Sequence, residues 1–376
     1  MIPLSAPELN GREWEYIKDC LDTGWVSSAG SYVDRFEKEM AAFTGLPCAT
    51  ATNSGTAALH ISLLLAGVQA EDYVIVPDLT FVAPVNAVRY TGARPILIDA
   101  DEETWQMDQD LLEEFLARET ETREGGCYLK KDDKRIRCLM PVHVLGAMGD
   151  MHRLTELAGK HALNVIEDAS EALGSRYDGR PAGSFGLLGC FSFNGNKIIT
   201  SGGGGMIVTG NEDLAARARH LTTQAKTGAD DYFHDEAGYN YRLVNVLAAI
   251  GVAQMEQLPA FTERKKQVAA RYRQQLDHTG DISFQQHHPL SSSNEWLCTI
   301  STTEQSGLRE HLAKNDIMTR PIWTPMHRLP MYKDELYISM DNHADTLHAR
   351  CLSIPSSSGI SEAAVEQVIR IIKAYF

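Results

Sequence analysis

Short apolar segments alternate with amphipathic ones through the first half of the chain. The apolar runs that predict buried strands lie at residues 47–52, 73–77, 95–99, 138–144 and 163–167. Segments with helical spacing of apolar residues separate them, at residues 57–66, 81–90, 111–117 and 151–161. Strands that alternate with helices in this way predict an α/β fold, in which helices cover both faces of a mostly parallel central sheet.

Other segments complete the large part of the fold. Amphipathic helices are predicted before the alternating region, over residues 8–21 and 33–43, and a loop of small polar residues joins them. The strongly polar residues 119–137 predict an exposed loop or hairpin. Further helices are predicted over residues 211–221 and 244–258, with an irregular polar stretch at 222–238 between them.

A proline at position 259 breaks the helical pattern and marks the predicted end of a large domain, residues 1–258. A charged helix over residues 261–276 then leads into a smaller C-terminal α/β domain, residues 259–376. This domain contains a predicted strand at 295–301 and a final helix at 361–374. A chain of 376 residues is long enough for two such domains.

Composition narrows the class of protein. The formal net charge of −15 argues against nonspecific binding to nucleic acid or to an anionic membrane. The seven scattered cysteines favour reduced thiols in a cytoplasmic protein. The sequence has no metal-binding motif of the Cys-x-x-Cys or His-Glu-x-x-His type, no signal peptide and no apolar run that could span a bilayer.

The most distinctive stretch covers residues 189–205 and reads GCFSFNGNKIITSGGGG. It opens as a strand, turns at Asn194-Gly195, presents Lys197, and reaches four glycines before a second strand at 206–209. Burial disfavours the ammonium form of a lysine, so a lysine on a tight connection between buried strands is costly unless it has a function. That function is a Schiff base with an aldehyde cofactor; the alternative is a solvated hairpin lysine.

Two further features suggest a cofactor site. The turn at residues 53–56 opens a helix, and the free N–H groups and dipole of a helix N-terminus favour a phosphate. Asp168 follows the strand at 163–167, at the edge of the sheet where ligands gather. Each feature alone is also consistent with an ordinary helix cap. Together with Lys197 they match the phosphate, ring nitrogen and aldehyde of pyridoxal 5′-phosphate (PLP).

Five motifs in this order resemble the PLP-dependent nucleotide-sugar aminotransferases of the DegT-like family, which have the aspartate aminotransferase fold, PLP fold type I. The motifs are TNSGTAAL at 52–59, TFVA at 80–83, EDASE at 167–171, SFNGNK at 192–197 and GYNYR at 238–242. The resemblance covers nearly the whole chain. It implies a transaminase, because Lys197 is retained where relatives that dehydrate sugars have a histidine.

The resemblance implies a role for each matching residue. Lys197 forms the Schiff base and moves a proton between cofactor and substrate, and Asp168 binds the pyridine nitrogen. Phe81 stacks on the ring, although the pattern alone favours a core residue. Asn240 reaches the cofactor of the other subunit, which implies a homodimer with shared active sites. The phosphate is bound by Gly55, Thr56, Ala57 and Ser192.

One position departs from the usual pattern of the family. Three residues after Asp168 the family usually has glutamine, close to the 3′-oxygen of the cofactor, and this chain has Glu171. A carboxylate beside a phenolate is repulsive, so Glu171 either shares a proton or points elsewhere.

Within the family, the motifs resemble most the branch that makes UDP-4-amino-4,6-dideoxy-N-acetylglucosamine, a precursor of bacillosamine and legionaminic acid. This implies that L-glutamate gives its amino group to UDP-2-acetamido-4-keto-6-deoxyglucose for surface glycan synthesis. Such substrates favour cationic contacts, for which Arg242, Arg320 and His327 are candidates. The alternatives are a GDP- or dTDP-linked keto sugar as acceptor, or a non-catalytic regulatory protein that has kept the fold.

Overall fold

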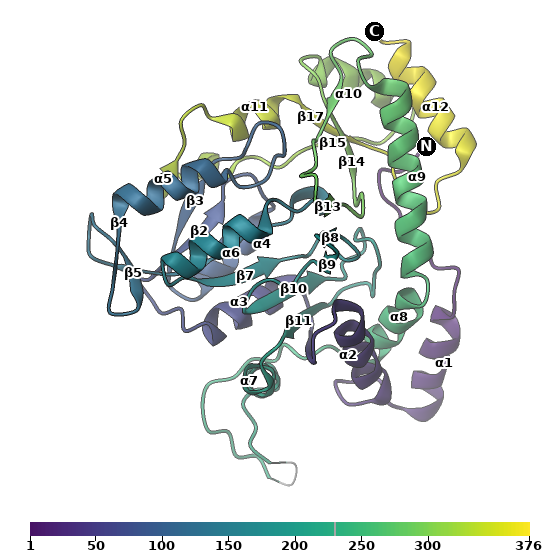
Figure 1. The fold of residues 1–376 in the computed structure, drawn as a ribbon. Helices are drawn as coiled ribbons and strands as arrows, with labels where there is room; N and C mark the ends of the chain where they lie inside the picture. Colours follow the sequence, from purple (N-terminus) through teal and green to yellow (C-terminus); the bar gives the residue numbers. More distant parts are fainter. Residues whose placement is uncertain (229–230) are drawn as a thin grey trace.

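The computed structural model describes residues 1–228 and 231–376, and a large sheet forms the centre of the molecule (Figure 1). The main path of this sheet runs through β1 (Cys48–Thr52), β11 (Gly205–Thr209), β10 (Leu188–Ser192), β7 (Asn164–Asp168), β6 (Arg135–Leu139), β2 (Tyr73–Pro77), β3 (Arg94–Ile98) and β16 (Leu336–Ile338). Strand β11 is antiparallel to both of its neighbours, and the other neighbouring pairs on this path are parallel. The predicted α/β fold with a mostly parallel sheet is confirmed.

Helices pack on both faces of the sheet because its strands are apolar at successive positions. In β2, Tyr73 and Ile75 pack on one side, whereas Val74 and Val76 pack on the other. The first face is covered by α2 (Ser31–Thr44), α5 (Gln109–Glu119), α6 (Met151–Lys160) and α8 (Asn245–Met255), and the second by α3 (Gly55–Leu65), α4 (Val82–Tyr90) and α7 (Glu212–Thr222). Since both faces are covered, ligands reach this sheet at the ends of its strands.

Several segments differ from the predicted boundaries, and one settles an open alternative. The first helix, α1 (Glu13–Thr23), starts later than residue 8, because the Glu8 carbonyl accepts a hydrogen bond from Gln254 at 2.8 Å. Strand β6 ends before Pro141, which has no N–H for the ladder. The polar residues 119–137 form a hairpin, β4 (Thr120–Arg123) and β5 (Gly126–Leu129), whose second strand pairs with β6.

The irregular polar stretch predicted at 222–238 has no named helix or strand in its described residues after α7 ends at Thr222. Residues 229 and 230 of this stretch lie outside the described part of the chain. Near it, His220, Asp235 and Glu236 bring possible metal-ligand atoms within 4.8 Å of one another. Arg217 forms an ion pair with Glu236, which already neutralises one of these carboxylates.

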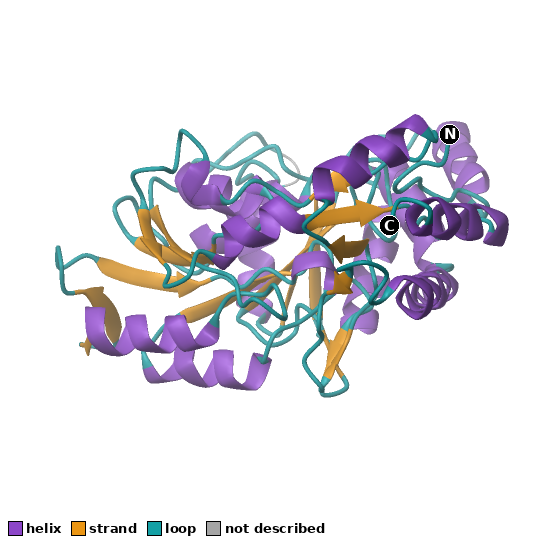
Figure 2. Cartoon of the chain, turned by 90° about the horizontal axis from the view of Figure 1, so that it is seen from above, coloured by secondary structure: helices purple, strands orange, loops and turns teal. Residues whose placement is uncertain are grey.

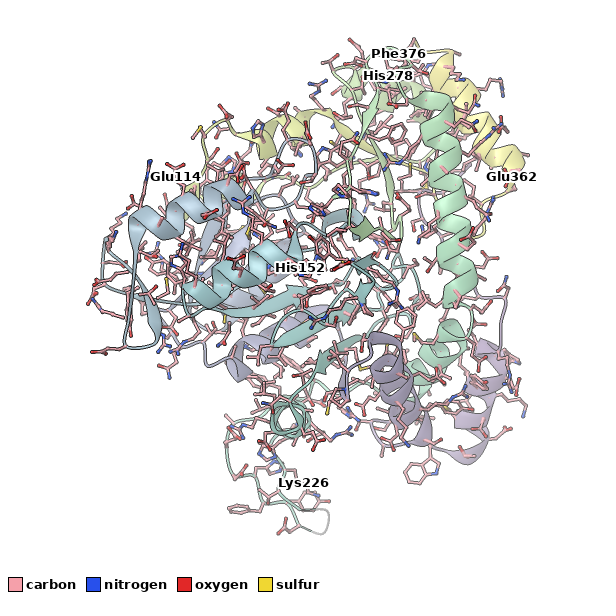
Figure 3. All side chains as sticks on the ribbon, in the orientation of Figure 1. Glu114, His152, Lys226, His278, Glu362 and Phe376 are labelled. Atoms are coloured by element: carbon pink, nitrogen blue, oxygen red, sulfur yellow. The ribbon has the colours of Figure 1, made fainter. Side chains whose placement is uncertain are left out.

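The C-terminal part has its own apolar core around a four-stranded antiparallel sheet. This sheet runs through β12 (Ser283–Phe284), β14 (Cys298–Ser301), β17 (Cys351–Ile354) and β15 (Arg320–Pro321), and α9 (Leu258–Leu276), α10 (Gln305–Lys314) and α12 (Glu362–Lys373) pack against it. Figure 3 shows the last residue, Phe376, beside His278, which follows α9. The domain boundary predicted after residue 258 stays a prediction, because β16 returns to pair with β3 of the large sheet.

Shorter elements complete the fold. They are η1 (Val144–Gly146), β8 (Arg176–Tyr177), β9 (Arg180–Pro181), β13 (Ser291–Ser292), η2 (Met326–Arg328) and α11 (His343–Arg350). Three of them, β13, β8 and β9, form a small sheet of their own. Figure 2 shows both ends of the chain on the same side of the molecule, among helices. No helix in the described part of the chain is long and apolar enough to cross a membrane. All seven cysteines are free, and all except Cys48 are buried.

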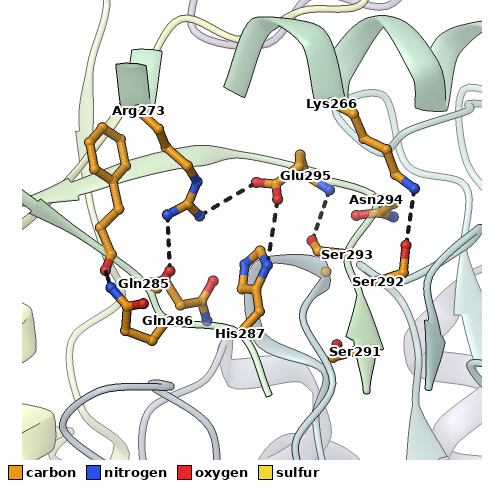
Figure 4. A network of polar contacts seen from close by, with 12 residues as sticks. Lys266, Arg273, Gln285, Gln286, His287, Ser291, Ser292, Ser293, Asn294 and Glu295 are labelled. Carbon is orange, nitrogen blue, oxygen red and sulfur yellow. Dashed lines mark hydrogen bonds and ion pairs between the residues drawn. The ribbon is translucent and has the colours of Figure 1, made fainter. Parts of the chain in front are cut away.

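Polar contacts from α9 hold the segment that precedes β14 (Figure 4). The Arg273 guanidinium lies 3.9 Å from the Glu295 carboxylate, and His287 Nδ1 lies 3.7 Å from the same group. Closer to the start of α9, Lys266 donates to the Ser292 hydroxyl at 3.1 Å. These contacts fix the backbone next to Trp296, which follows Glu295 and lines the cavity described below.

Candidate active site

A cavity of about 330 Å³ lies at the carboxyl ends of the parallel strands. Its walls come from the start of α3, the β2–α4 turn, the end of β7, the β10–β11 connection and the C-terminal part. The lining residues include Gly55, Thr56, Thr80, Phe81, Asp168, Ser170, Glu171, Ser192, Lys197, Trp296, Arg320 and Trp323. Residues far apart in the sequence therefore meet at the edge where the strand pattern predicts ligand binding.

Lys197 projects into this cavity from the β10–β11 connection, with a side chain that is 12% exposed. Its N–H donates to the Asn194 carbonyl at 3.0 Å, which forms the predicted turn. Its Nζ lies 3.5 Å from Glu171 Oε1 and 4.2 Å from the centre of the Trp296 ring. A carboxylate and an aromatic face both attract an ammonium group. The alternative of a solvated hairpin lysine is therefore wrong.

The start of α3 approaches the lysine-bearing connection closely, and glycines make this approach possible. Ser54 caps the helix by accepting a hydrogen bond from the Ala57 N–H at 3.1 Å, and Gly55 follows as the first helical residue. A Cβ on Gly205 would lie 2.4 Å from the Ser54 carbonyl oxygen, and a Cβ on Gly55 would lie 2.7 Å from Ser192 Cβ. The first N–H groups of a helix have no intrahelical acceptor, so this cradle offers donors to an anion.

Asp168 ends β7 and is 3% exposed. Its carboxylate accepts a hydrogen bond from the Ser170 N–H at 3.0 Å, and burial raises its pKa. The preceding residue, Glu167, bonds elsewhere: its carboxylate lies 3.0 Å from His143 Nε2 and accepts from the Gly183 N–H at 2.9 Å. A buried carboxylate at a strand end suits a cationic ring nitrogen, because the cation offsets the cost of burying the charge.

Glu171 points into the cavity. It is 5% exposed, its Oε2 accepts a hydrogen bond from the Leu145 N–H at 2.9 Å, and its Oε1 faces Lys197. Burial raises the pKa of Glu171 to about 7, although Lys197 and the Leu145 N–H act in the opposite direction. Of the two predicted alternatives for Glu171, the one in which it points elsewhere is wrong.

Two residues of the β2–α4 turn, Thr80 and Phe81, line the cavity. Phe81 is 52% exposed at the cavity, so the interpretation as a core residue is wrong and its ring is available for stacking. Thr80 Oγ1 is buried and has no hydrogen-bond partner within the described ranges.

Asn240 does not line the cavity of its own chain. It is exposed, and its carbonyl accepts a hydrogen bond from Asn53 Nδ2 at 3.2 Å.

Two tryptophans of the site were not predicted from the sequence. Trp296 is 3% exposed and its Nε1 donates to the Asn196 carbonyl at 2.7 Å, next to Lys197. The Trp323 ring stacks on it with a centroid distance of 6.5 Å. Two features of the sequence could have pointed to these tryptophans: the chain has only five, and Trp323 lies three residues after the predicted substrate contact Arg320. Arg320 also lines an adjoining cavity of about 200 Å³.

The structure does not bring the other two predicted substrate contacts to the cavity. The Arg242 guanidinium is buried, forms an ion pair with Glu37 and donates to the Ala51 carbonyl at 3.2 Å. His327 Nδ1 lies 2.7 Å from Asp78 Oδ2, and its ring stacks on Tyr337 at 4.2 Å. As a correction, Arg242 and His327 stabilise the fold of this chain and do not line its cavity.

The cavity fits PLP on three structural grounds. Glycines 55 and 205 leave a cradle at a helix start that any Cβ would fill, Thr80 keeps a hydroxyl without a partner in the described residues, and Lys197 shares the cavity with the buried acid Asp168. Together with the α/β fold, these features define a PLP-dependent enzyme of fold type I.

The chain belongs to the DegT/DnrJ/EryC1/StrS aminotransferase family, whose model matches residues 7–373. It is 40% identical to the GDP-perosamine synthase of Escherichia coli O157:H7 over 98% of this chain and 96% of that protein. It is 35% identical to the GDP-perosamine synthase of Vibrio cholerae over 100% of this chain and 99% of that protein.

Solved structures show the same fold. The chain of DesV from S. venezuelae, in complex with a ketimine intermediate, superposes with a TM-score of 0.87 at 30% identity, over 97% of this chain and 94% of that chain. A DegT/DnrJ/EryC1/StrS aminotransferase from Brucella abortus superposes with a TM-score of 0.90 at 26% identity, over 97% and 95% of the two chains. The protein is therefore a PLP-dependent sugar aminotransferase, and the alternative of a non-catalytic regulatory protein is wrong.

Proposed function

We propose that this enzyme transfers the amino group of L-glutamate to the keto carbon of a GDP-linked 4-keto-6-deoxy sugar. The observation that carries the proposal is the cavity that holds Lys197, Asp168 and the start of α3 at one edge of the sheet. The choice of GDP is supported by the identity to two GDP-perosamine synthases. A GDP-linked acceptor thus replaces the UDP-linked acceptor that the sequence motifs favour. The experiment below distinguishes between the two.

In this proposal each cavity residue has one task. PLP would supply an aldehyde carbon that carries the amino group between the two substrates, and a ring that takes up the electron pair left when the substrate carbon loses a proton. Lys197 would hold the cofactor through its aldehyde, and its Nζ, when free, would accept and return a proton. Asp168 keeps the ring nitrogen protonated, and Phe81 covers the ring. The phosphate would be bound by the N–H groups of Gly55 and Thr56 and by the Ser192 hydroxyl, while the Ala57 N–H is capped by Ser54.

Arg320 is the substrate contact that we propose to keep. It is exposed, it lines the cavity, and it has no ion pair among the residues that the structure describes. A guanidinium suits the carboxylates of glutamate and the diphosphate of a nucleotide sugar, because both accept paired hydrogen bonds. Arg242 and His327 are not proposed as substrate contacts, because their side chains bind Glu37 and Asp78.

We also propose a homodimer in which Asn240 reaches the cofactor of the partner subunit. The support is that Asn240 is exposed, and that its segment lies against the cofactor cradle: the Asn53 N–H donates to the Tyr241 carbonyl at 2.7 Å. An exposed polar side chain beside the cradle is available to a second copy of the chain. A cytoplasmic location remains a prediction from the sequence.

The test is spectral and uses the purified enzyme with PLP. Borohydride should fix the cofactor on the peptide that contains Lys197, and fixation on another lysine would overturn the assignment. Glutamate alone should bleach the visible absorption, and a GDP-linked 4-keto-6-deoxyhexose should restore it. Restoration only by UDP-2-acetamido-4-keto-6-deoxyglucose or by a dTDP-linked keto sugar would refute the choice of GDP and leave the aminotransferase activity standing.

A further inference from the structure

Four ionisable side chains line the cavity: the cations Lys197 and Arg320, and the acids Asp168 and Glu171. Asp168 already accepts a hydrogen bond from the Ser170 N–H. Glu171 lies with Oε1 3.5 Å from Lys197 Nζ, and within residues 1–228 and 231–376 neither of these two groups has another ion-pair partner. The cavity therefore pairs its lysine with Glu171.

The backbone around Glu171 fixes the orientation of its carboxylate. Oε2 accepts from the N–H of Leu145, a residue held at a φ of 60°, in the left-handed region that non-glycine residues seldom adopt. The amide of Asn294 donates to the Glu171 carbonyl at 2.8 Å. With Oε2 and the main chain held in this way, Oε1 is left facing Lys197.

We infer that Glu171 is the proton partner of Lys197, and this inference rests on the function proposed for the lysine. Lys197 must lose a proton before Nζ can attack an aldehyde. In this step one N–H bond at Nζ breaks and one O–H bond forms at Glu171 Oε1, so an ion pair becomes a neutral pair without any other reagent. The reverse step returns the proton to the amine.

The surroundings of the pair favour this exchange. The charged group that faces Glu171 from the β10–β11 connection is Lys197, and the one from the end of β7 is Asp168, which repels a second negative charge. The η1 segment contributes the Leu145 N–H, and the C-terminal part contributes the uncharged ring of Trp296 beside Nζ. A carboxyl group whose pKa is about 7 exchanges protons most effectively near neutral pH. A glutamine at this position could bind the lysine, but it could not take its proton.

The first experiment measures the protonation of Lys197 in the full-length protein freed of PLP. Lys197 is labelled with an isotopic acid anhydride between pH 6 and pH 10, and its labelling rate is quantified by mass spectrometry. If Glu171 takes the proton, some Nζ is neutral while the pair still holds one proton. The labelling rate of wild-type Lys197, plotted against pH, should then rise in two steps with a plateau between them. In Glu171→Gln, which keeps the size of the side chain, the rate should rise in one step.

Controls separate this role from a simple counter-ion. Glu362→Gln removes a carboxylate of α12 that pairs with Arg264 and does not line the cavity, and it should keep both steps. Glu171→Asp keeps an acid at a greater distance and should lower the plateau, which preserves the test if the glutamine variant does not fold. A single step in the wild type would overturn the inference, as would a Glu171→Gln profile that keeps two.

The second experiment uses the enzyme with PLP bound and glutamate as the only substrate. Glu171→Gln should slow the bleaching step by about 100-fold, a typical contribution of a positioned proton-transfer group, and should remove the dependence of that step on pH near 7. An unchanged rate and pH profile would contradict the inference. Cofactor fixation on a lysine other than Lys197 would instead contradict the proposed function, so the two failures are distinguishable.

Discussion

Replacing Gly55 by alanine tests whether the start of α3 and the end of β10 form the phosphate cradle together. A Cβ at this position would lie 2.7 Å from Ser192 Cβ and 3.2 Å from its Oγ. Carbon atoms that are not bonded to each other do not approach within 3.0 Å, so the helix start or Ser192 has to move. Either movement separates the Ser192 hydroxyl from the first N–H groups of the helix.

The expected magnitude follows from two opposing contributions. Overpacking costs about 1–3 kcal/mol, and the better helix propensity of alanine returns about 1 kcal/mol, so the protein without PLP should lose about 0–2 kcal/mol of its free energy of unfolding. Loss of one hydrogen bond to the charged phosphate costs a further ~1.5–3 kcal/mol, which weakens the Kd of PLP by a factor of roughly 10–150. The effect on cofactor binding should therefore exceed the effect on folding.

The assay is a PLP titration followed by absorbance, together with urea unfolding of the protein without PLP. Gly159→Ala is the matched control, because Gly159 lies in α6 and an added Cβ meets no atom within 4 Å. That control should gain about 0.5–1 kcal/mol in stability and keep its Kd. If Gly55→Ala binds PLP within threefold of the wild type, Ser192 and the helix start do not act on the phosphate as one cradle.

Three further outcomes are expected. Arg320→Ala should raise the KM of glutamate or of the sugar nucleotide by at least tenfold in steady-state assays, and an unchanged KM for both would refute the contact. Asn240→Ala mixed with Lys197→Ala should recover activity through heterodimers, and a verified heterodimer without activity would place Asn240 in its own subunit. Burial lowers the pKa of Lys265 from 10.5 to about 8, so between these pH values the unfolded chain binds more protons than the folded one. Urea titrations should therefore show that the stability of the wild type, minus that of Lys265→Met, rises from about pH 8 to 10.5. A flat difference would show that folding does not lower the pKa of Lys265.

The sequence predicts most strands of the large sheet because their pattern is local, although it does not predict β16. Residues 73–77 are apolar throughout, and β2 has these bounds in the structure because both of its faces are buried. In a parallel sheet the strand ends gather at one edge, so the predictions of Asp168 and of the turn at 53–56 required no tertiary information. Lys197 could be predicted for a related reason, since its turn and its glycines are neighbours in the sequence.

Contacts between distant segments could not be predicted in this way. Arg242 has the residue type of a substrate contact, and only the fold shows that Glu37, in α2, binds its guanidinium. His327 is likewise bound to Asp78, the residue directly after β2. Trp296 reaches Lys197 because the C-terminal part packs against the β10–β11 connection, and no periodicity of the sequence carries that information.

The C-terminal part therefore contributes to the chemistry of a site whose cofactor contacts come mainly from the large sheet. Lys265 of α9 is fully buried, and its ammonium donates to the carbonyls of Trp296 and Ser356 at 2.8 and 2.6 Å. A buried ammonium without a carboxylate partner costs folding free energy, so this arrangement is not explained by stability alone. Lys265 instead fixes the backbone of Trp296. The Trp296 ring lies against Nζ of Lys197, and its Nε1 donates to the carbonyl of Asn196, the residue before Lys197. A displacement of α9 relative to the large sheet would thus move the wall beside the reactive amine, and this links the packing of the C-terminal core to the position of the catalytic lysine.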